Sequence, residues 1–505
     1  MNNKPTTNIL LSAVLLIFPS ALIAQIDTLR EYRHKADSVL IADSIYAWDN
    51  PLNQKKHPWK AATEAFCINA GVQLFDRFVI NGDYSHISAN SVWHNIKNGF
   101  VWDNDQFSTN LFAHPYHGGL YFNSARSNGM SFWQSVPYSF CGSLMWELAC
   151  ETDPPAINDL MATTIGGACI GEITHRVSDL VYDDRERGLS RFLREFAGAL
   201  TCPIRELNRI LNGDAWRVRH DYYEYHDYNR IPVDFSVAFG DRYLADKGAM
   251  FRGEHNPYLD MYLIYGDAFN DEENNPYDYF TANVTFGFTG NQPLISDIHL
   301  LGRLWTAPIY SGDKIDAEFG IFQHFNYYNS QPVKGGTSQV PFRISEAASV
   351  GPGVIYRFPE VGNISKLEQH IFLDAILLGG SLTDYYRFVD RDYNMGSGYS
   401  IKVKTIMEFR KMGSFSVNAD FYRIYTWKGY ENKNYESIDP RYLNAQGDKG
   451  NATLLVINPQ IEFNLTDKLA LQLHSSYYFR RTIYTYHENV EYNTFEIRLG
   501  FNYKI

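Results

Sequence analysis

The C-terminal half of the chain alternates apolar and polar residues with a period of two, and this pattern restricts it to β-strands. The clearest segment ends at the last of the 505 residues. Its apolar positions are Phe495, Ile497, Leu499, Phe501, Tyr503 and Ile505. Its alternate positions are Thr494, Glu496, Arg498, Gly500, Asn502 and Lys504. An amphipathic terminal strand with aromatic residues is typical of an outer-membrane β-barrel.

The same alternation recurs through residues 231–505, in about twelve segments. A β-sandwich would turn the polar face outward and share the apolar faces in a core. A membrane barrel does the reverse, with lipid outside and a polar lumen. The aromatic content of 15% favours the barrel, because barrels place aromatic rings at both membrane interfaces. We therefore predict a transmembrane β-barrel of about twelve antiparallel strands. Its predicted extracellular loops are residues 271–277, 329–339 and 430–450.

The N-terminus has the three parts of a secretory signal peptide. Lys4 precedes an uncharged apolar run at residues 9–18, and small residues lead to a predicted cleavage point after Ala24. The run is short for a spanning helix, although a retained anchor is the alternative. Residues 25–57 are polar and are predicted to be a periplasmic segment.

An exported chain with a barrel is expected in the bacterial outer membrane. Its expected partners are outer-membrane lipids and the barrel assembly machinery. The net charge of -12 argues against a nucleic-acid partner. Five cysteines are a sparse and odd set for an oxidising compartment, so we predict buried thiols and leave a disulfide open.

Residues 58–220 have longer apolar periods and are predicted to form a helical domain that plugs or caps the lumen. Residues 127–146 carry no charge, but polar residues and Pro137 favour a helix buried within protein over a spanning one. A helix over residues 159–180 presents Thr163, Gly167 and Gly171 on one stripe, where another backbone could approach closely. A further helix over residues 189–211 is expected to kink at Pro203.

Several blocks of this domain resemble the domain of unknown function 3943 family. They are HPYHGGLYFNSARSNG at 114–129, SLMWE at 143–147 with Glu151, NDL at 158–160, GG at 166–167, GE at 171–172 and HR at 175–176. The resemblance covers about residues 57–220, and DRDYN at 390–394 is similar to the same proteins. It implies a bacterial outer-membrane-type protein. Because the family is uncharacterised, it implies no activity, cofactor or catalytic residue.

The candidate site is a set of ionisable side chains in this domain. Its members are His114, His117, Arg126, Glu147, Glu151, Asp159, Glu172, His175 and Arg176. Glu172 and His175 have the i, i+3 spacing of bundle-held metal sites, but a dinuclear site needs two such pairs. With His175, the two histidines of the 114–117 turn could complete a mononuclear site, so the metal and cofactor stay unknown.

Three interpretations of this set remain open. It could be an ion-pair network that holds the helices to lumenal charges such as Lys402, Lys404, Glu408 and Arg410. It could instead form a hydrolase or transferase site for envelope lipids, in which a His and a carboxylate activate water. Ligand-gated transport is the third. The sequence has no Gly-x-Ser-x-Gly, His-Glu-x-x-His or phosphate-binding glycine loop. The lumenal residues His299, His324 and His474 are interpreted as wall residues.

Overall fold

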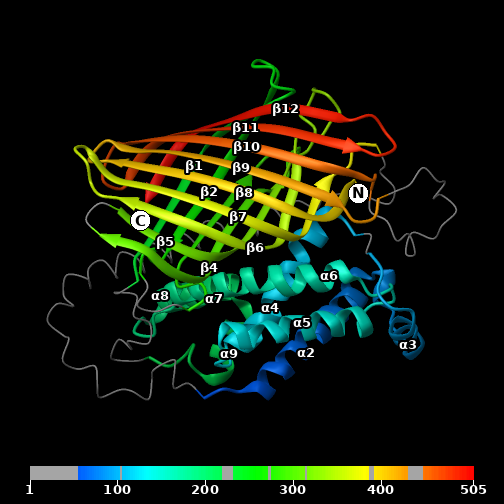
Figure 1. Cartoon of the computed structure of the whole chain (residues 1–505). Helices are drawn as coiled ribbons and strands as arrows, with labels where there is room; N and C mark the ends of the chain where they lie inside the picture. Colours follow the sequence, from blue (N-terminus) through cyan, green and yellow to red (C-terminus); the bar gives the residue numbers. More distant parts are fainter. Residues whose placement is uncertain are drawn as a thin grey trace.

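A computed structural model describes residues 55–102, 105–218, 231–270, 275–312, 315–385, 392–429 and 447–505. The predicted signal peptide, residues 1–24, lies outside the described residues, and so does nearly all of the predicted periplasmic segment. Helices come first in the chain and a β-barrel follows (Figure 1).

Twelve antiparallel strands form a closed barrel, in which β12 pairs with β1 to complete the circle. Each of the other strands pairs with its neighbours in the sequence. The strands are β1 (Val233–Ala245), β2 (Gly253–Tyr265), β3 (Phe280–Gly287), β4 (Ile295–Gly312), β5 (Ile315–Asn329), β6 (Arg343–Phe358), β7 (Ile364–Leu382), β8 (Tyr393–Phe409), β9 (Gly413–Thr426), β10 (Gly450–Asn464), β11 (Leu469–Tyr484) and β12 (Val490–Lys504). The predicted barrel and its number of strands are confirmed.

The two faces of the sheet have the polarity of a membrane barrel. On β12, Leu499 is 54% exposed and Ile497 is 39% exposed, whereas Glu496 is fully buried and Arg498 is 5% exposed. Successive side chains of a strand point to opposite faces, so the apolar side faces outward and the charged side faces the lumen. A β-sandwich would show the opposite distribution.

The barrel has two ends, which differ in their connections. The terminal end carries Val233 and Lys504, the outer limits of the sheet, and the connection from β2 to β3. The loop end carries the β5–β6 and β9–β10 connections, because hairpins alternate between the two ends. Residues 275–277, the described part of the predicted loop 271–277, therefore lie at the opposite end from residues 330–339. The prediction that both face the same side of the membrane was wrong, since only strand parity decides the end.

The lumen is filled near the loop end. Residues 330–342, between β5 and β6, bring Val333 and Phe342 into an apolar cluster with Tyr328, Tyr422 and Tyr478. The rings of Phe342 and Tyr478 are stacked with centroids 3.9 Å apart. Because the cluster joins strands from opposite sides of the barrel, it packs across the lumen.

The helical domain precedes the barrel. Its α-helices are α2 (Pro58–Phe75), α3 (Ala89–Asn98), α4 (His114–Arg126), α5 (Phe132–Ala149), α6 (Ile157–Met161), α7 (Gly167–Val181), α8 (Gly188–Thr201) and α9 (Pro203–Asn212). Shorter turns are η4 (Asp76–Ile80), η5 (Asp83–Ser85), η6 (Thr109–Ala113) and η7 (Ala162–Gly166). Ser131 caps α5 through a reciprocal capping box with Gln134. In the described residues, the helices are each too short or too polar to cross a membrane.

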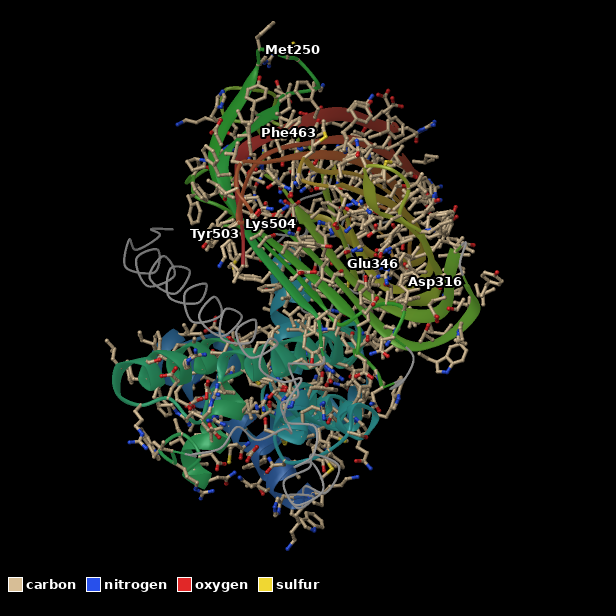
Figure 2. All side chains as sticks on the ribbon, turned by 90° about the vertical axis from the view of Figure 1, so that its left-hand side faces the viewer. Met250, Asp316, Glu346, Phe463, Tyr503 and Lys504 are labelled. Carbon is tan, nitrogen blue, oxygen red and sulfur yellow. The ribbon has the colours of Figure 1, made fainter. Side chains whose placement is uncertain are left out.

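The helical domain lies beside the barrel wall, and the prediction that it plugs or caps the lumen was wrong in this respect. Phe325 and Tyr327 of β5 are buried in one apolar cluster with Phe107 and Ile173 of the helical domain. Asn326, between them, lines the lumen. Because neighbours on a strand face opposite ways, the helices cover the outer surface. Figure 1 shows the helices alongside the barrel, and Figure 2, turned by 90°, shows them again beside the barrel and not inside it.

Helices α4 and α7 cross with their backbones in close contact, as the small-residue stripe predicted. A Cβ atom on Gly118 would lie 1.8 Å from the carbonyl oxygen of Thr163. A Cβ atom on Gly167 would lie 2.6 Å from the Gly118 backbone. Only glycine therefore permits this spacing.

Other helical predictions need correction. The helix predicted over residues 189–211 is two helices, because Pro203 begins α9 after α8 ends at Thr201. Residues 127–146 are predicted to form a helix buried within protein, but the corresponding helix α5 is buried on one face only. All five cysteines are free, but Cys67 and Cys141 are exposed, so the prediction of buried thiols holds for Cys169 and Cys202 and not for these two.

Candidate functional site

The most completely paired part of the predicted site is a carboxylate between two guanidinium groups. Glu172 of α7 is fully buried. Arg126, at the end of α4, donates to it from Nε at 2.6 Å and from Nη2 at 3.0 Å. Arg176, one turn further along α7, donates from Nε at 2.8 Å. This contact therefore links α4 to α7.

The same network continues into the barrel. Arg176 donates from Nη2 to Asp278 Oδ1 at 3.0 Å and to the carbonyl oxygen of Pro276 at 2.9 Å. Its guanidinium also lies 5.6 Å from the ring centroid of Tyr265. Asp278 belongs to the connection between β2 and β3, at the terminal end. An ion-pair network therefore joins the helical domain to the barrel.

Electrostatics keep this network ionised. Burial alone would raise the pKa of Glu172, but the charges of Arg126 and Arg176 outweigh it and hold that pKa below its ordinary value. A buried carboxylate with three charge-assisted hydrogen bonds is satisfied in its charged form. It is consequently a poor general acid or base at neutral pH.

A second part of the predicted site surrounds two histidines of α4. His114 Nε2 lies 3.7 Å from Asp159 Oδ1 and 3.9 Å from Asp105 Oδ2. Burial lowers the pKa of His114, but these carboxylates raise it to about 10. Burial and the nearby charge of His114 lower the pKa of His117 to about 3. The result is an imidazolium one turn from a neutral imidazole.

The surroundings of His117 are aromatic. Its ring centroid lies 4.6 Å from that of Tyr121 and 5.4 Å from that of Trp146. Its Nε2 is buried and has no hydrogen-bond partner within the described parts of the chain. This atom is a polar group that an incoming ligand could satisfy.

The remaining predicted residues also make described contacts with other parts of the helical domain. A carboxylate oxygen of Glu147 accepts from the backbone N–H of Ala156 at 2.7 Å and so holds the start of α6. The carbonyl oxygen of Glu151 accepts from Asn95 at 3.0 Å. The carbonyl oxygen of His175 accepts from Arg205 at 2.9 Å, toward α9. Among the nine candidates, Arg126, Glu172 and Arg176 thus form one cluster, and His114 and Asp159 form another.

The geometry gives no support to a metal centre in the described ranges. They contain no group of three or more His, Cys, Asp or Glu side chains that could hold a metal ion. His175 does not complete a site with His114 and His117. The spacing of Glu172 and His175 reflects helix periodicity, since Glu172 is occupied by two arginines.

The lumen holds a polar chamber of about 610 Å³ below the apolar cluster. Lys402 bridges Glu346 at 2.9 Å and Asp374 at 2.7 Å, and His324 lies 3.0 Å from Asp374. Figure 2 shows Glu346 within the barrel outline. Tyr328 lines the chamber and also belongs to the apolar cluster. The cluster therefore bounds the chamber on the side of the loop end.

The lumenal charges predicted to hold the helices have other partners. Lys402 pairs within the lumen, as above, and Lys404 donates to Tyr262 at 3.0 Å. Glu408 lies 3.8 Å from Lys366. Arg410 pairs with Glu360. The prediction that these charges hold the helical domain was wrong, because the helices lie outside the wall.

The wall histidines behave as predicted where contacts are described. His324 pairs with Asp374, and His299 Nδ1 lies 3.1 Å from Asn326 Oδ1.

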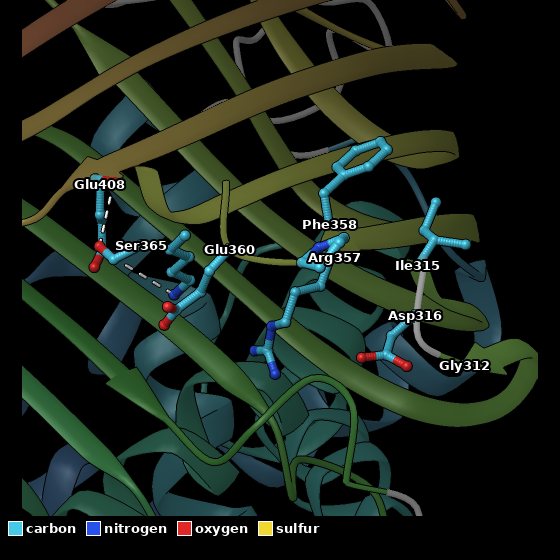
Figure 3. A pocket seen from close by; sticks show the side chains of 10 residues that line it. Gly312, Ile315, Asp316, Arg357, Phe358, Glu360, Ser365 and Glu408 are labelled. Carbon is cyan, nitrogen blue, oxygen red and sulfur yellow. Dashed lines mark hydrogen bonds and ion pairs between the residues drawn. The ribbon is translucent and has the colours of Figure 1, made fainter. Parts of the chain in front are cut away.

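A smaller hollow of about 450 Å³ lies at the terminal end, lined by Asp316, Arg357 and others (Figure 3). Arg357 Nε lies 2.7 Å from Glu368 Oε1, so the arginine that lines this hollow is already paired with a carboxylate.

Sequence reasoning missed the barrel partner of the helical domain, Asp278, and the second carboxylate beside His114, Asp105. Neither residue stands at helical spacing from its partner. Asp278 lies 102 positions from Arg176 in the sequence. The one available signal for Asp278 is that it directly follows the polar stretch 271–277, which is predicted to be a loop.

Comparisons with known proteins agree with the resemblance found in the sequence. Residues 99–204 match the family described as Domain of unknown function (DUF3943), which spans most of the helical domain. No curated protein matches the chain.

Similar solved structures are membrane barrels of low sequence identity. The NanC porin has 12% identity and a TM-score of 0.26, covering 54% of this chain and 100% of its own. OmpT, an outer membrane protein of Vibrio cholerae, has 9% identity and a TM-score of 0.23, covering 55% and 97%. An anion-selective porin from Comamonas acidovorans has 8% identity and a TM-score of 0.19, covering 55% and 99%.

Proposed function

We propose that this DUF3943-containing protein is a bacterial outer-membrane protein whose barrel serves as an anchor for the helical domain, and is not an open diffusion pore. Export by a signal peptide, insertion by the barrel assembly machinery and contact with outer-membrane lipids belong to this proposal. The apolar outer face and polar inner face of the barrel support the membrane location.

The observation that carries the anchoring role is the contact between Arg176 and Asp278. It continues a buried ion-pair network from the helical domain into a connection of the barrel. An apolar cluster shared by both parts adds to it. The stacking of Phe342 and Tyr478 across the lumen supports the second half of the proposal, because it narrows the path through the barrel.

Planar-bilayer recording tests the absence of a pore. Wild-type protein should give no steady conductance. Replacing residues 331–341 by a short Gly-Ser turn, together with Phe342→Ala, should produce channels, because it removes part of the apolar cluster that bounds the chamber. A matched variant, Phe251→Ala, changes an aromatic residue that is 97% exposed in another loop-end connection and should stay silent. Steady wild-type conductance would contradict the proposal and favour transport.

A second candidate, an enzyme acting on envelope lipids, is favoured by one observation. His117 presents a neutral, buried imidazole whose Nε2 has no partner in the described structure, one turn from the imidazolium of His114. A buried imidazole nitrogen without a partner can accept a hydrogen bond from a water molecule or from a hydroxyl group of a substrate and so hold it in place.

Lipid mass spectrometry tests this candidate. Cells making wild type, no protein, His117→Ala or His94→Ala would be compared at equal folded levels. His94 is an exposed histidine of α3 and is the matched control. An enzyme predicts a mass change present with wild type and His94→Ala and absent in the other two strains. Identical lipids in all four strains would remove the enzymatic candidate.

A further inference from the structure

The solvent-exposed surface of the helical domain is apolar over α8 and α9. On α8, Leu189 is 72% exposed, Phe192 is 61% exposed and Phe196 is 39% exposed. These positions are three and four residues apart, so they form one stripe. On α9, Ile210 and Leu211 are 42% and 66% exposed.

The charged residues of the same helices point inward. Arg191, Arg194 and Glu195 of α8 are all less than 10% exposed. Arg209 of α9 donates to Glu195 Oε1 at 2.9 Å. Its guanidinium also lies 4.1 Å from the ring centroid of Tyr182. A helix on a water-soluble domain has the opposite arrangement, with charges outside and apolar residues inside.

A second face has the same character. On α2, Phe66 is 59% exposed, while the side chain of Glu64 is only 12% exposed and accepts from Asn208 at 2.9 Å. On α5, Trp133 and Phe140 are 59% and 42% exposed. The exposed residues of η4 are also apolar: Phe78, Val79 and Ile80. Since several differently placed helices share this pattern, one small docking partner would not cover it.

The helical domain that carries these apolar faces lies beside the barrel (Figures 1 and 2). Figures 1 and 2 show the helical domain next to the wall and along its length. Elsewhere on the barrel, outward residues such as Leu373 and Leu473 are 52% and 43% exposed. A bilayer that surrounds the barrel would therefore reach the helices too.

Basic and aromatic residues flank the apolar face of α2. Lys55, Lys56 and the 85% exposed Trp59 precede or begin the helix. Lys60 Nζ contacts Asn212 Oδ1 at 3.1 Å, which brings the end of α9 to the same place. Tryptophan and lysine at one rim of an apolar surface are typical of the membrane–water interface.

We propose that the outward faces of α2, α5, α8 and α9 contact the acyl chains of the bilayer, so that the helical domain is seated in the hydrocarbon beside the barrel. The inward charges are then the polar interior of a lipid-facing bundle. The glycine contact between α4 and α7 is the packing that holds helices together in lipid. This inference rests on the proposed membrane location of the barrel.

Spin-label accessibility tests the proposal on the full-length protein in lipid vesicles. Cys67 and Cys141 are native, exposed thiols on α2 and α5, and can be labelled one at a time after replacing the other by alanine. Leu473→Cys reports the lipid-facing barrel wall, and Asp467→Cys reports a polar turn at the terminal end. Relaxation by dissolved oxygen detects lipid, and relaxation by a charged nickel chelate detects water.

Labels at Cys67 and Cys141 are expected to behave like Leu473→Cys, with relaxation by oxygen and loss of relaxation by the chelate. Chelate relaxation at both cysteines with an oxygen response at Leu473→Cys would overturn the inference and leave the membrane barrel intact. Chelate relaxation at all three sites would overturn the membrane barrel as well. Labels reached by neither agent would show that protein, such as a second copy, covers the face, which also overturns it.

Discussion

Glu172→Gln offers a direct test of how the helical domain is held together. The change keeps the shape of the side chain and removes its charge. In the wild type, Glu172 accepts three hydrogen bonds from Arg126 and Arg176 and is fully buried. The variant leaves two partly buried guanidinium groups without their carboxylate. Breaking one partner of a buried ion pair costs about 3–5 kcal/mol.

Hydrogen exchange of the full chain in lipid vesicles measures this cost locally. Amides of α7 should exchange faster in Glu172→Gln by a factor between about 10² and several times 10³, since each 1.4 kcal/mol is about tenfold. Amides of β11 should keep their protection, because the barrel is closed by its own backbone hydrogen bonds. Glu64→Gln is the matched control and should change exchange little. Its neutral partners Asn128 and Asn208 remain, and its charged contact with Lys60 is 3.9 Å long.

Acid provides a second measurement of the same network. The pKa of Glu172 is held below its ordinary value of 4.5, so its stabilising contribution is complete above pH 4.5. That contribution is lost as the pH falls through the lower folded pKa. Wild-type α7 should therefore open more readily on acidification below pH 4.5, and Glu172→Gln should lack this component. Equal exchange in wild type and Glu172→Gln, or identical acid responses, would refute the reasoning.

Two further predictions concern packing and the link to the barrel. Gly118→Ala places a methyl group against the backbone of Thr163 and should destabilise α4 and α7 by about 1–3 kcal/mol or more, seen as a lower thermal midpoint. Gly71→Ala, with open space around its Cβ, should stabilise α2 by up to about 1 kcal/mol, and equal effects of the two changes would contradict the packing. Asp278→Asn should cost about 1–3 kcal/mol and raise exchange in α7, because Arg176 loses one charged acceptor; unchanged exchange there would argue against this link.

The sequence determined the barrel. Strict alternation in segments such as residues 494–505 allows only strands with one apolar face, and the number of segments set the number of strands. The stripe of Thr163, Gly167 and Gly171 likewise predicted a close helix crossing, because local spacing fixes which residues share a helix face. The candidate ionisable residues Arg126, Glu172 and Arg176 were also found from local blocks.

The tertiary structure decided what those pieces contact. Periodicity defines a face but does not say what covers it, so it could not distinguish a helical domain inside the lumen from one against the outer wall. Arg176 finds Asp278, 102 positions away, only because a connection of the barrel passes beside α7. The charged residues and phenylalanines of α8 lie on opposite faces of the helix, and this pattern is the same whichever face is covered by protein. Only the position of α8 relative to its neighbours decided which side is outside, since that depends on contacts between distant parts of the chain.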